Sequence, residues 1–251
     1  MKFTRDWLQN YVDLGEVASD KLADDLTMIG LEVDSVTELY EDLSSLKTGR
    51  VLTVVPHPNA DKLTLCQVLV GQDTLQIVCG APNVREGLGV VVALPGTTLP
   101  GDFKIKKSKV RGVESQGMLC SERELGLSDD HQGIMELPDD TETGFSFIEC
   151  TGLKDTQIEV DLTPNRPDCA SVIGVARETA GILRKKIEIP YTNTRLTTVS
   201  SSFAVEVENP DLCPRYAARL ISGITIGPSP WWLRKRLLSV GLRPINNVVD
   251  I

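Results

Sequence analysis

Histidine is scarce in this 251-residue chain, which contains only His57 and His131. The six cysteines are scattered, and no two of them form a C-x-x-C pair. Because structural zinc sites need cysteine or histidine ligands at close, regular spacings, we expect no metal site. In a reducing compartment such isolated cysteines are expected to be buried as small apolar side chains.

Long apolar runs are also missing. No run approaches the roughly 20 residues that a membrane-spanning helix needs, and residues 1–8 (M-K-F-T-R-D-W-L) contain no apolar signal core. We therefore expect a cytoplasmic protein. Hydrophobic residues make up 41% of the chain and charged residues 24%, which is ordinary for a soluble globular protein. The length allows one large domain or two to three small ones.

The net charge of −9 is unevenly distributed. Residues 121–160 alone carry a net charge of −9, whereas residues 51–120 carry +2. An acidic chain is usually a poor partner for nucleic acid, but a local basic face on such a chain can still bind one. The overall charge therefore excludes neither possibility.

Five basic side chains fall within eight residues, at Lys104, Lys106, Lys107, Lys109 and Arg111. If this segment is a strand, alternation places Lys107, Lys109 and Arg111 on one face, spaced about 6–7 Å apart. Such a row can follow a phosphate backbone. It can equally be a solvated strand whose lysines discourage edge-to-edge aggregation. The charges alone leave both interpretations open.

The stretch from residue 46 to 127 consists of short apolar or β-branched runs separated by Gly, Pro, Asn and Asp. Residues 63–70 and 75–78 are rich in β-formers, and residues 89–94 are almost wholly apolar. Several short strands at regular spacing predict a small all-β barrel or sandwich.

The first forty residues predict a small α/β element. Thr4 can cap a helix over residues 5–12, and Ser19 can cap a second helix over residues 20–29. Residues 31–39 then alternate imperfectly in the manner of a strand.

A loop over the acidic residues 128–149 follows the barrel, with one or two short strands. In D-L-T-P-N-R-P-D-C-A (161–170), two prolines three positions apart exclude regular structure. Asp168 is then placed to cap the helix that follows. Residues 192–202 form a polar linker.

Residues 203–207 and 215–226 predict strands, and Ser229 can cap a helix over residues 230–240. The basic side chains of that helix either contact RNA or form a solvated face; they are Arg234, Lys235 and Arg236. Residues 245–251 predict the start of another helix, so we expect the chain to be a fragment.

Three motifs carry a resemblance to a known family: H-P-N-A-D-K-L (57–63), I-V-C-G-A-P-N-V (77–84), and K-V-R-G-V-E-S-Q-G-M-L-C-S-E-R-E-L-G-L (109–127). The chain resembles the tRNA-binding oligonucleotide/oligosaccharide-binding (OB) barrel. Methionyl-tRNA synthetase appendages, stand-alone tRNA-binding proteins and the bacterial phenylalanyl-tRNA synthetase β subunit share this barrel.

Motifs outside the barrel resemble the bacterial phenylalanyl-tRNA synthetase β subunit in particular. They are F-x-x-x-W-L (3–8), G-L-E-V-D (30–34), D-L-T-P-N-R-P-D-C (161–169) and R-P-I-N-N-V-V-D-I (243–251). The resemblance implies an α+β multidomain fold. Residues 1–39 and 150–191 would form a split α/β domain, residues 40–149 an inserted OB barrel, and residues 203–251 the start of an α/β editing domain, after the linker at 192–202.

The resemblance also implies a function. The family attaches phenylalanine to tRNA(Phe) with ATP and Mg²⁺, at an active site on the α subunit of an α2β2 enzyme, and it hydrolyses mischarged tyrosyl-tRNA in the editing domain. We expect no catalytic residue, no bound cofactor and no independent activity in this chain, which lacks a phosphate-binding G-x-x-x-x-G-K-[ST] motif. The α subunit and tRNA are the expected partners.

The resemblance places Arg243 near the editing pocket, where a guanidinium can pair with a phosphate or ribose. It assigns tRNA binding to the basic segment of the barrel. Two alternatives are kept. One is a stand-alone tRNA-binding or chaperone module without enzyme activity, which leaves the residues after 150 unexplained. The other is a protein-interaction barrel that binds no RNA.

Overall fold

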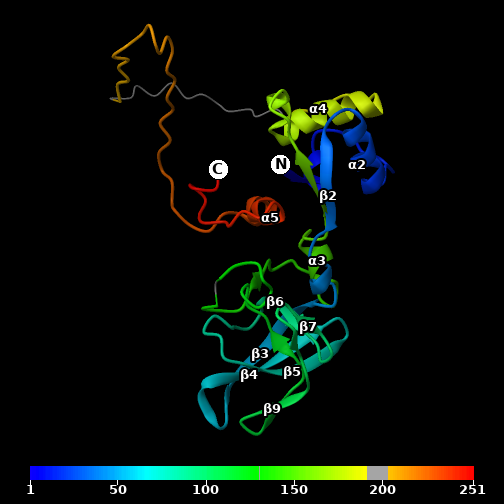
Figure 1. The fold of residues 1–251 in the computed structure, drawn as a ribbon. Coiled ribbons are helices and arrows are strands. Elements are labelled where there is room, and N and C mark those ends of the chain that lie inside the picture. The colour runs from blue at the N-terminus through cyan, green and yellow to red at the C-terminus, as the bar shows by residue number, and fades with distance from the viewer. Residues whose placement is uncertain (130, 191–202) are drawn as a thin grey trace.

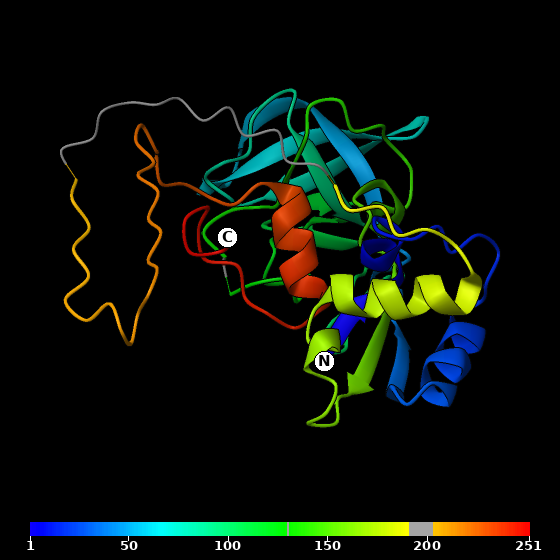
Figure 2. The ribbon, with the colours of Figure 1, turned by 90° about the horizontal axis from the view of Figure 1, so that it is seen from above.

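The computed structural model describes residues 1–129, 131–190 and 203–251. The predicted linker at 192–202 lies outside these residues. Within them, no helix is both long and apolar enough to cross a membrane. The described chain forms a β barrel, a smaller sheet covered by helices, and a final segment that contains the helix α5 (Figures 1 and 2).

The barrel is an antiparallel sheet with the strand order β11-β6-β3-β4-β5, in which β12 also pairs with β6. Two short hairpins, β7–β8 and β9–β10, extend it. The strands are β3 (Lys47–His57), β4 (Ala60–Val70), β5 (Asp73–Cys79), β6 (Gly89–Ala93), β7 (Thr98–Leu99), β8 (Phe103–Lys104), β9 (Ser108–Val110), β10 (Val113–Ser115), β11 (Met118–Leu119) and β12 (Glu136–Leu137).

The apolar run in β6 marks the middle of the barrel. All five residues of β6 are buried. Val91 and Ala93 belong to one core cluster and Val90 and Val92 to another. Because successive side chains of a strand point to opposite faces, a strand with cores on both sides has no polar position. The uninterrupted apolar pattern at residues 89–94 is explained in this way.

The smaller sheet has the order β1-β13-β2 and is antiparallel throughout. Its strands are β1 (Lys2–Thr4), β13 (Thr156–Asp161) and β2 (Glu32–Glu38); the helices around it are α1 (Arg5–Gln9), α2 (Ser19–Met28) and α4 (Val172–Leu183). One buried cluster joins the two distant parts of the sequence, with Phe3, Leu22 and Leu26 on one side and Ile158 and Val175 on the other. This unit therefore closes only after the barrel has been traversed.

The chain enters and leaves the barrel through two neighbouring segments. One contains the 3₁₀ helix η1 (Glu41–Leu43), and the other follows the helix α3 (Phe147–Cys150). Beside them, the Leu39 amide donates to the Asp155 carbonyl oxygen at 2.9 Å, and the Thr156 hydroxyl donates to Glu38 at 2.8 Å. We call these two connecting segments, residues 39–46 and 151–155, the neck (Figure 1).

Of the helix caps predicted for α1, α2 and α4, one is correct and two are wrong. The Thr4 hydroxyl accepts from the Trp7 amide at 3.3 Å, as predicted, although α1 ends at Gln9. Ser19 does not cap α2 but is its first residue. Asp168 does not cap α4 either. Ser171 takes this role by accepting from the Gly174 amide at 3.1 Å, because the 3₁₀ helix η2 (Pro167–Cys169) shifts the start of α4 towards the C-terminus.

The strands predicted at 203–207 and 215–226 are wrong. In the described chain these stretches are not assigned to any strand, and side chains such as Leu220 and Ile224 are exposed. A strand is stabilised by hydrogen bonds to a neighbouring strand, and these stretches lack that pairing among the described residues.

Helix α5 (Trp231–Ser239) is confirmed, but Ser229 does not cap it. The Ser229 hydroxyl donates to the Asp250 carboxylate instead. Residues 247–249 form a turn in which the Asp250 amide donates to the Asn246 carbonyl oxygen at 3.0 Å, as in the first turn of the helix predicted from residue 245. Asn246 accepts from the amides of Val248 and Val249, each at 3.0 Å, and so closes a turn.

Burial of the cysteines is confirmed for Cys66, Cys79, Cys120 and Cys169. It is wrong for Cys150, which is exposed at the end of α3, and for Cys213, which is only partly buried.

We predict that Phe147→Ala destabilises the chain by about 3–5 kcal/mol, because it empties a fully buried site in the barrel core. Urea unfolding followed by circular dichroism measures this. Phe145 lies two residues away and is 52% exposed, so Phe145→Ala is the matched control, with an expected change within ~0.5 kcal/mol. Equal losses in both variants would contradict the assignment of Phe147 to the core.

Candidate nucleic-acid interface

The basic segment is not one continuous strand. Lys104 ends β8, Lys106 and Lys107 lie in the connection to β9, and only Lys109 lies within β9. Arg111 is in the β9–β10 turn, with a φ of 48°. The predicted single strand face of Lys107, Lys109 and Arg111 is therefore wrong.

The turn explains why the strand stops. Val110 and Val113 pair across it, so Arg111 and Gly112 form a two-residue loop. Their φ values are 48° and 91°. Positive φ at both positions is the pattern of a type I′ turn, which matches the twist of the strands, and glycine adopts this conformation at least cost. The R-G pair of the K-V-R-G motif is thus a turn signal.

The five basic side chains are nevertheless exposed and uncompensated. All five residues are exposed, and among the described residues none of their side chains forms an ion pair or hydrogen bond. The nearest acidic residue along the hairpin is Glu114, which lies opposite Lys109 in the strand register. Exposed cations without an internal partner can pair with phosphate without losing a protein contact.

The H-P-N motif fastens this hairpin to the barrel. His57 is only 5% exposed, and its Nε2 lies 3.1 Å from the Val110 carbonyl oxygen. Its Nδ1 accepts from the Asn59 amide at 3.0 Å, so the neutral ring carries its proton on Nε2 and donates to Val110. The Asn59 side-chain amide donates to the Arg111 carbonyl oxygen at 3.1 Å. Both contacts end at the turn that carries Arg111.

Polar side chains hold the other arm of the hairpin. The Ser115 hydroxyl accepts from the Val78 amide at 3.1 Å, and the Gln76 side chain donates to the Glu114 carbonyl oxygen at 2.9 Å. The Gln116 amide donates to the Gln76 carbonyl oxygen at 2.9 Å. These bonds replace a regular ladder at the edge strand β5, which explains the E-S-Q part of the motif.

The N-V-R run after C-G-A-P orders the acidic exit of the barrel. Asn83 exchanges two hydrogen bonds with the backbone of Ile134, at 2.9 and 3.0 Å. Arg85 donates to both oxygens of Glu136, at 2.9 and 2.8 Å. These hydrogen bonds lower the pKa of Glu136, against a smaller opposing effect of burial.

The one group of candidate metal ligands found among the described residues is Asp168, Cys169 and Glu178. Arg166 already pairs with both carboxylates, each at 3.0 Å, and this lowers the pKa of Asp168 to about 2. Burial raises the pKa of the Cys169 thiol to about 11. A protonated thiol and carboxylates bridged by a guanidinium do not fit a metal ion. In the N-R-P-D-C motif, this network fixes the approach to α4.

The remaining basic candidates are all paired. Arg243 contacts Asp129 at 2.8 Å, and both side chains are largely exposed. The sequence suggested that the cations of α5 either contact RNA or form a solvated face. In the structure each of them contacts another part of the fold. Arg234 pairs with Glu122, Lys235 with Asp6, and Arg236 stacks on Trp7.

Replacing His57 tests whether the motif fixes the hairpin. We predict that His57→Ala lowers the local stability of residues 108–115 by about 1–3 kcal/mol, because Val110 and Asn59 lose their hydrogen-bond partner. Amide hydrogen exchange of those residues measures the change. His131→Ala removes the other, exposed histidine and should leave the hairpin unaffected. Unchanged exchange in His57→Ala would refute the assigned role.

The Arg85–Glu136 pair should make stability depend on pH. A carboxyl whose pKa is lowered on folding stabilises the fold above its ordinary pKa, 4.5 here, and loses this contribution as the pH falls through the lowered value. Because both side chains are about half exposed, Glu136→Gln should cost at most ~1 kcal/mol at pH 7. The difference from the unmutated chain should shrink towards pH 3 in urea titrations; a constant difference would contradict it.

Comparisons with known proteins give a consistent result. Residues 46–146 match the family model of a tRNA binding domain, and residues 212–251 match that of the B3/4 domain. The whole chain is 63% identical to a phenylalanine–tRNA ligase beta subunit of Desulfotalea psychrophila, 53% to that of Syntrophotalea carbinolica and 52% to that of Geobacter sulfurreducens.

These matches cover 100% of this chain but only 31–32% of each relative. The similarity therefore includes the sheet, the barrel and the segment with α5, and it is not confined to the tRNA-binding barrel. The chain belongs to the family of phenylalanine–tRNA ligase beta subunits, and it spans about a third of the length of the relatives it matches.

Proposed function

We propose that this chain is the tRNA-contacting part of a phenylalanine–tRNA ligase β subunit, an enzyme that attaches phenylalanine to tRNA(Phe) in the cytoplasm. The observation that carries the proposal is similarity to such subunits along the whole of this chain, combined with an exposed basic hairpin on a tRNA-binding barrel. The proposed contacts are Lys104, Lys106, Lys107, Lys109 and Arg111.

The hairpin suits a phosphate backbone better than a base-reading role. Its cations are lysines and one arginine on short strands and a turn, and they carry charge without a fixed hydrogen-bonding frame. Lysine acts on phosphate as a point charge, whereas base recognition relies on bidentate or stacking groups. We therefore expect affinity that depends strongly on salt and weakly on sequence.

The proposed organisation follows from the connectivity. Residues 1–39 and 150–191 form a split domain and residues 40–149 an inserted OB barrel. The shared core of the β1-β13-β2 unit and its two-segment neck support this division. Residues 203–251 are proposed as the start of the editing domain, supported by the B3/4 match over residues 212–251.

Arg243 is proposed to act in that editing domain. Its guanidinium is 71% exposed and pairs only with an exposed aspartate among the residues described. Exposed ion pairs contribute little, about 0–1 kcal/mol. Arg243 can therefore exchange Asp129 for a tRNA phosphate or ribose at small cost.

ATP and Mg²⁺ are proposed to bind to the α subunit of an α2β2 enzyme. The acidic cluster at Asp168 does not fit Mg²⁺, because Arg166 already bridges its carboxylates. A stand-alone tRNA-binding or chaperone module is not favoured, since the similarity to β subunits continues through residues 150–251. The part of this chain in the reaction is thus binding and assembly.

The test is a fluorescence-anisotropy titration of tRNA(Phe) over a salt series. The triple variant Lys107→Glu, Lys109→Glu, Arg111→Glu should bind far more weakly than the unmutated chain. Its log–log salt slope should be smaller by roughly 2–3, because each lost phosphate contact contributes about 0.7–0.9.

The matched control carries three equal charge changes on the other unit, Lys21→Glu, Arg177→Glu and Lys186→Glu, and should retain most of the affinity. If both triple variants weaken binding equally, net charge and not the hairpin carries the affinity. If the unmutated chain binds no tRNA at low salt, a protein-interaction barrel without RNA binding is correct.

A further inference from the structure

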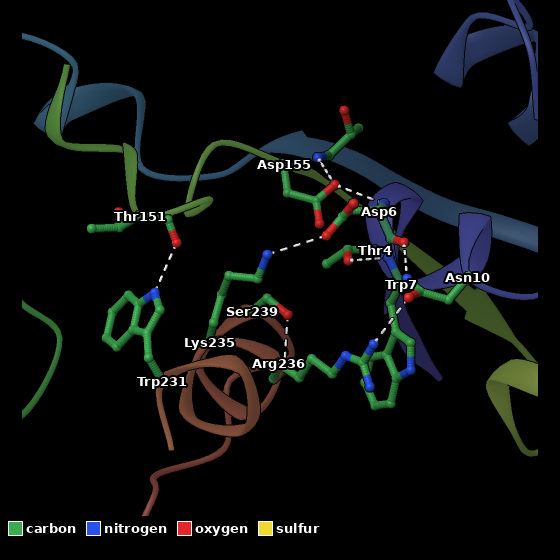
Figure 3. Close-up of polar contacts among 11 residues, drawn as sticks. Thr4, Asp6, Trp7, Asn10, Thr151, Asp155, Trp231, Lys235, Arg236 and Ser239 are labelled. Carbon is green, nitrogen blue, oxygen red and sulfur yellow. Dashed lines mark hydrogen bonds and ion pairs between the residues drawn. The ribbon is translucent and has the colours of Figure 1, made fainter. Parts of the chain in front are cut away.

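All three tryptophans of the chain lie on or against α5. Trp231 and Trp232 begin the helix, and Trp7 belongs to α1. The Arg236 guanidinium is 5.4 Å from the ring centroid of Trp7 (Figure 3) and also 5.4 Å from that of Trp232. Cation–π contacts of this length stabilise most where they are shielded from water. Trp7 and Arg236 thus join α5 to α1 across 229 positions of sequence.

The same helix is fastened to the barrel. Arg234 donates to both oxygens of Glu122, at 2.8 and 2.7 Å, and both side chains are about four-fifths buried. Trp231 and Leu238 pack against the apolar cluster of the barrel that contains Phe147. An ion pair at this depth is much less screened than one on the surface.

Two further contacts reach the end of the neck and the start of β13. The Trp231 indole donates to the Thr151 carbonyl oxygen at 2.8 Å (Figure 3). The Gln157 side chain donates to the Ser239 carbonyl oxygen. Lys235 pairs with Asp6 at 3.2 Å on the side of α1. We call the contacts of α5 with α1, with residues 151–157 and with Glu122 the α5 junction.

The geometry of the neck indicates what the α5 junction can do. The barrel is joined to the β1-β13-β2 unit through two adjacent chain segments, with Leu39 bonded to Asp155 and Thr156 to Glu38. Two such segments side by side resist stretching but leave bending about the neck open. Helix α5 contacts the chain on both sides of the neck and bridges it, and the two views agree on this placement (Figures 1 and 2).

We propose that α5 is a positioning helix that fixes the orientation of the barrel relative to the β1-β13-β2 unit, and that Arg234, Lys235 and Arg236 serve this internal interface and not RNA. For Arg234 or Lys235 to pair with phosphate in place of a carboxylate, an ion pair of the junction must break. Provided that the hairpin binds tRNA as proposed above, α5 also determines the direction in which the hairpin presents it.

Charge-exchange variants of the 251-residue chain test the proposal. Arg234→Glu places two acids together, and Glu122→Arg in the same chain restores the pair with reversed polarity. Lys235→Glu and Asp6→Lys form a second, independent exchange. Intrinsic fluorescence is a direct readout, because every tryptophan of the chain lies at the junction. Hydrogen exchange of residues 5–10, 39–46 and 151–157 reports on α1 and the neck.

We expect each single variant to shift tryptophan emission to longer wavelength. Hydrogen exchange in those residues should become about 5- to 30-fold faster, which corresponds to a loss of about one to two kcal/mol of local stability. Both exchanged pairs should return emission and exchange towards those of the unmutated chain. Amides of β4 and β6 should stay protected in every variant, which shows that the barrel remains folded. Lys107→Glu, the same charge change at an exposed and unpaired hairpin residue, is the matched control and should change neither readout.

Unchanged emission and exchange in the single variants, or a failure of both exchanged pairs to restore them, would overturn the proposal. The tRNA titration separates this result from failure of the proposed function. If the hairpin binds RNA and α5 does not, Arg234→Glu keeps the salt slope of the unmutated chain while Lys107→Glu reduces it. Equal losses of slope in the two variants would show that α5 contacts RNA.

Discussion

The fold depends on one constraint of connectivity: the chain must leave the β1-β13-β2 sheet and return to its middle strand. Strand β13 pairs with β2 on one side and β1 on the other, so the sheet is completed only by residues 156–161. Everything between Glu38 and Thr156 must therefore begin and end at neighbouring points, which the bonds from Leu39 to Asp155 and from Thr156 to Glu38 mark. A barrel meets this requirement, because its own core makes it independent of the sheet.

Polar side chains, and not additional strands, make the short pieces of the barrel rigid. The β9–β10 hairpin has three residues in each arm, too few to be stable alone in water. His57 and Asn59 hold its turn, and Ser115 and Gln76 hold its second arm against β5. Each bond ends on a backbone group, so the positions of Lys109 and Arg111 are set while their side chains stay exposed. The family motifs around the hairpin are in this respect structural, and the cations between them are available to a ligand.

The sequence predicts features that depend on nearby residues and fails for features that depend on residues far along the chain. Thr4 caps α1 because its amide partner is three residues away, and β6 is buried because its composition permits nothing else. The cap of α4 belongs to Ser171 because η2 moves the helix start, and Ser229 is engaged by Asp250, 21 positions on. The apolar stretches after residue 203 have strand composition without a pairing partner in the described chain. For the basic segment, the clustering of cations could be read from the sequence. The predicted single strand face was wrong, because the two positive φ values at Arg111 and Gly112 interrupt the strand.

The distribution of charge follows from the same contacts. The acidic residues 121–160 supply partners for cations elsewhere, Glu122 for Arg234 and Glu136 for Arg85, and Glu149 pairs with Lys154 inside the same stretch. Asp155 accepts from the backbone amides of Asp6 and Thr156, although burial raises its pKa. The hairpin cations have no such partner among the described residues, so a chain with a net charge of −9 still presents a positive surface at one end of the barrel. Salt should then act unequally on the two sets. It screens the exposed lysines within about 10 Å at 0.1 M, whereas the partly buried Arg234–Glu122 pair is screened far less. If the hairpin binds a polyanion as proposed, salt that releases it should leave the Arg234–Glu122 pair intact.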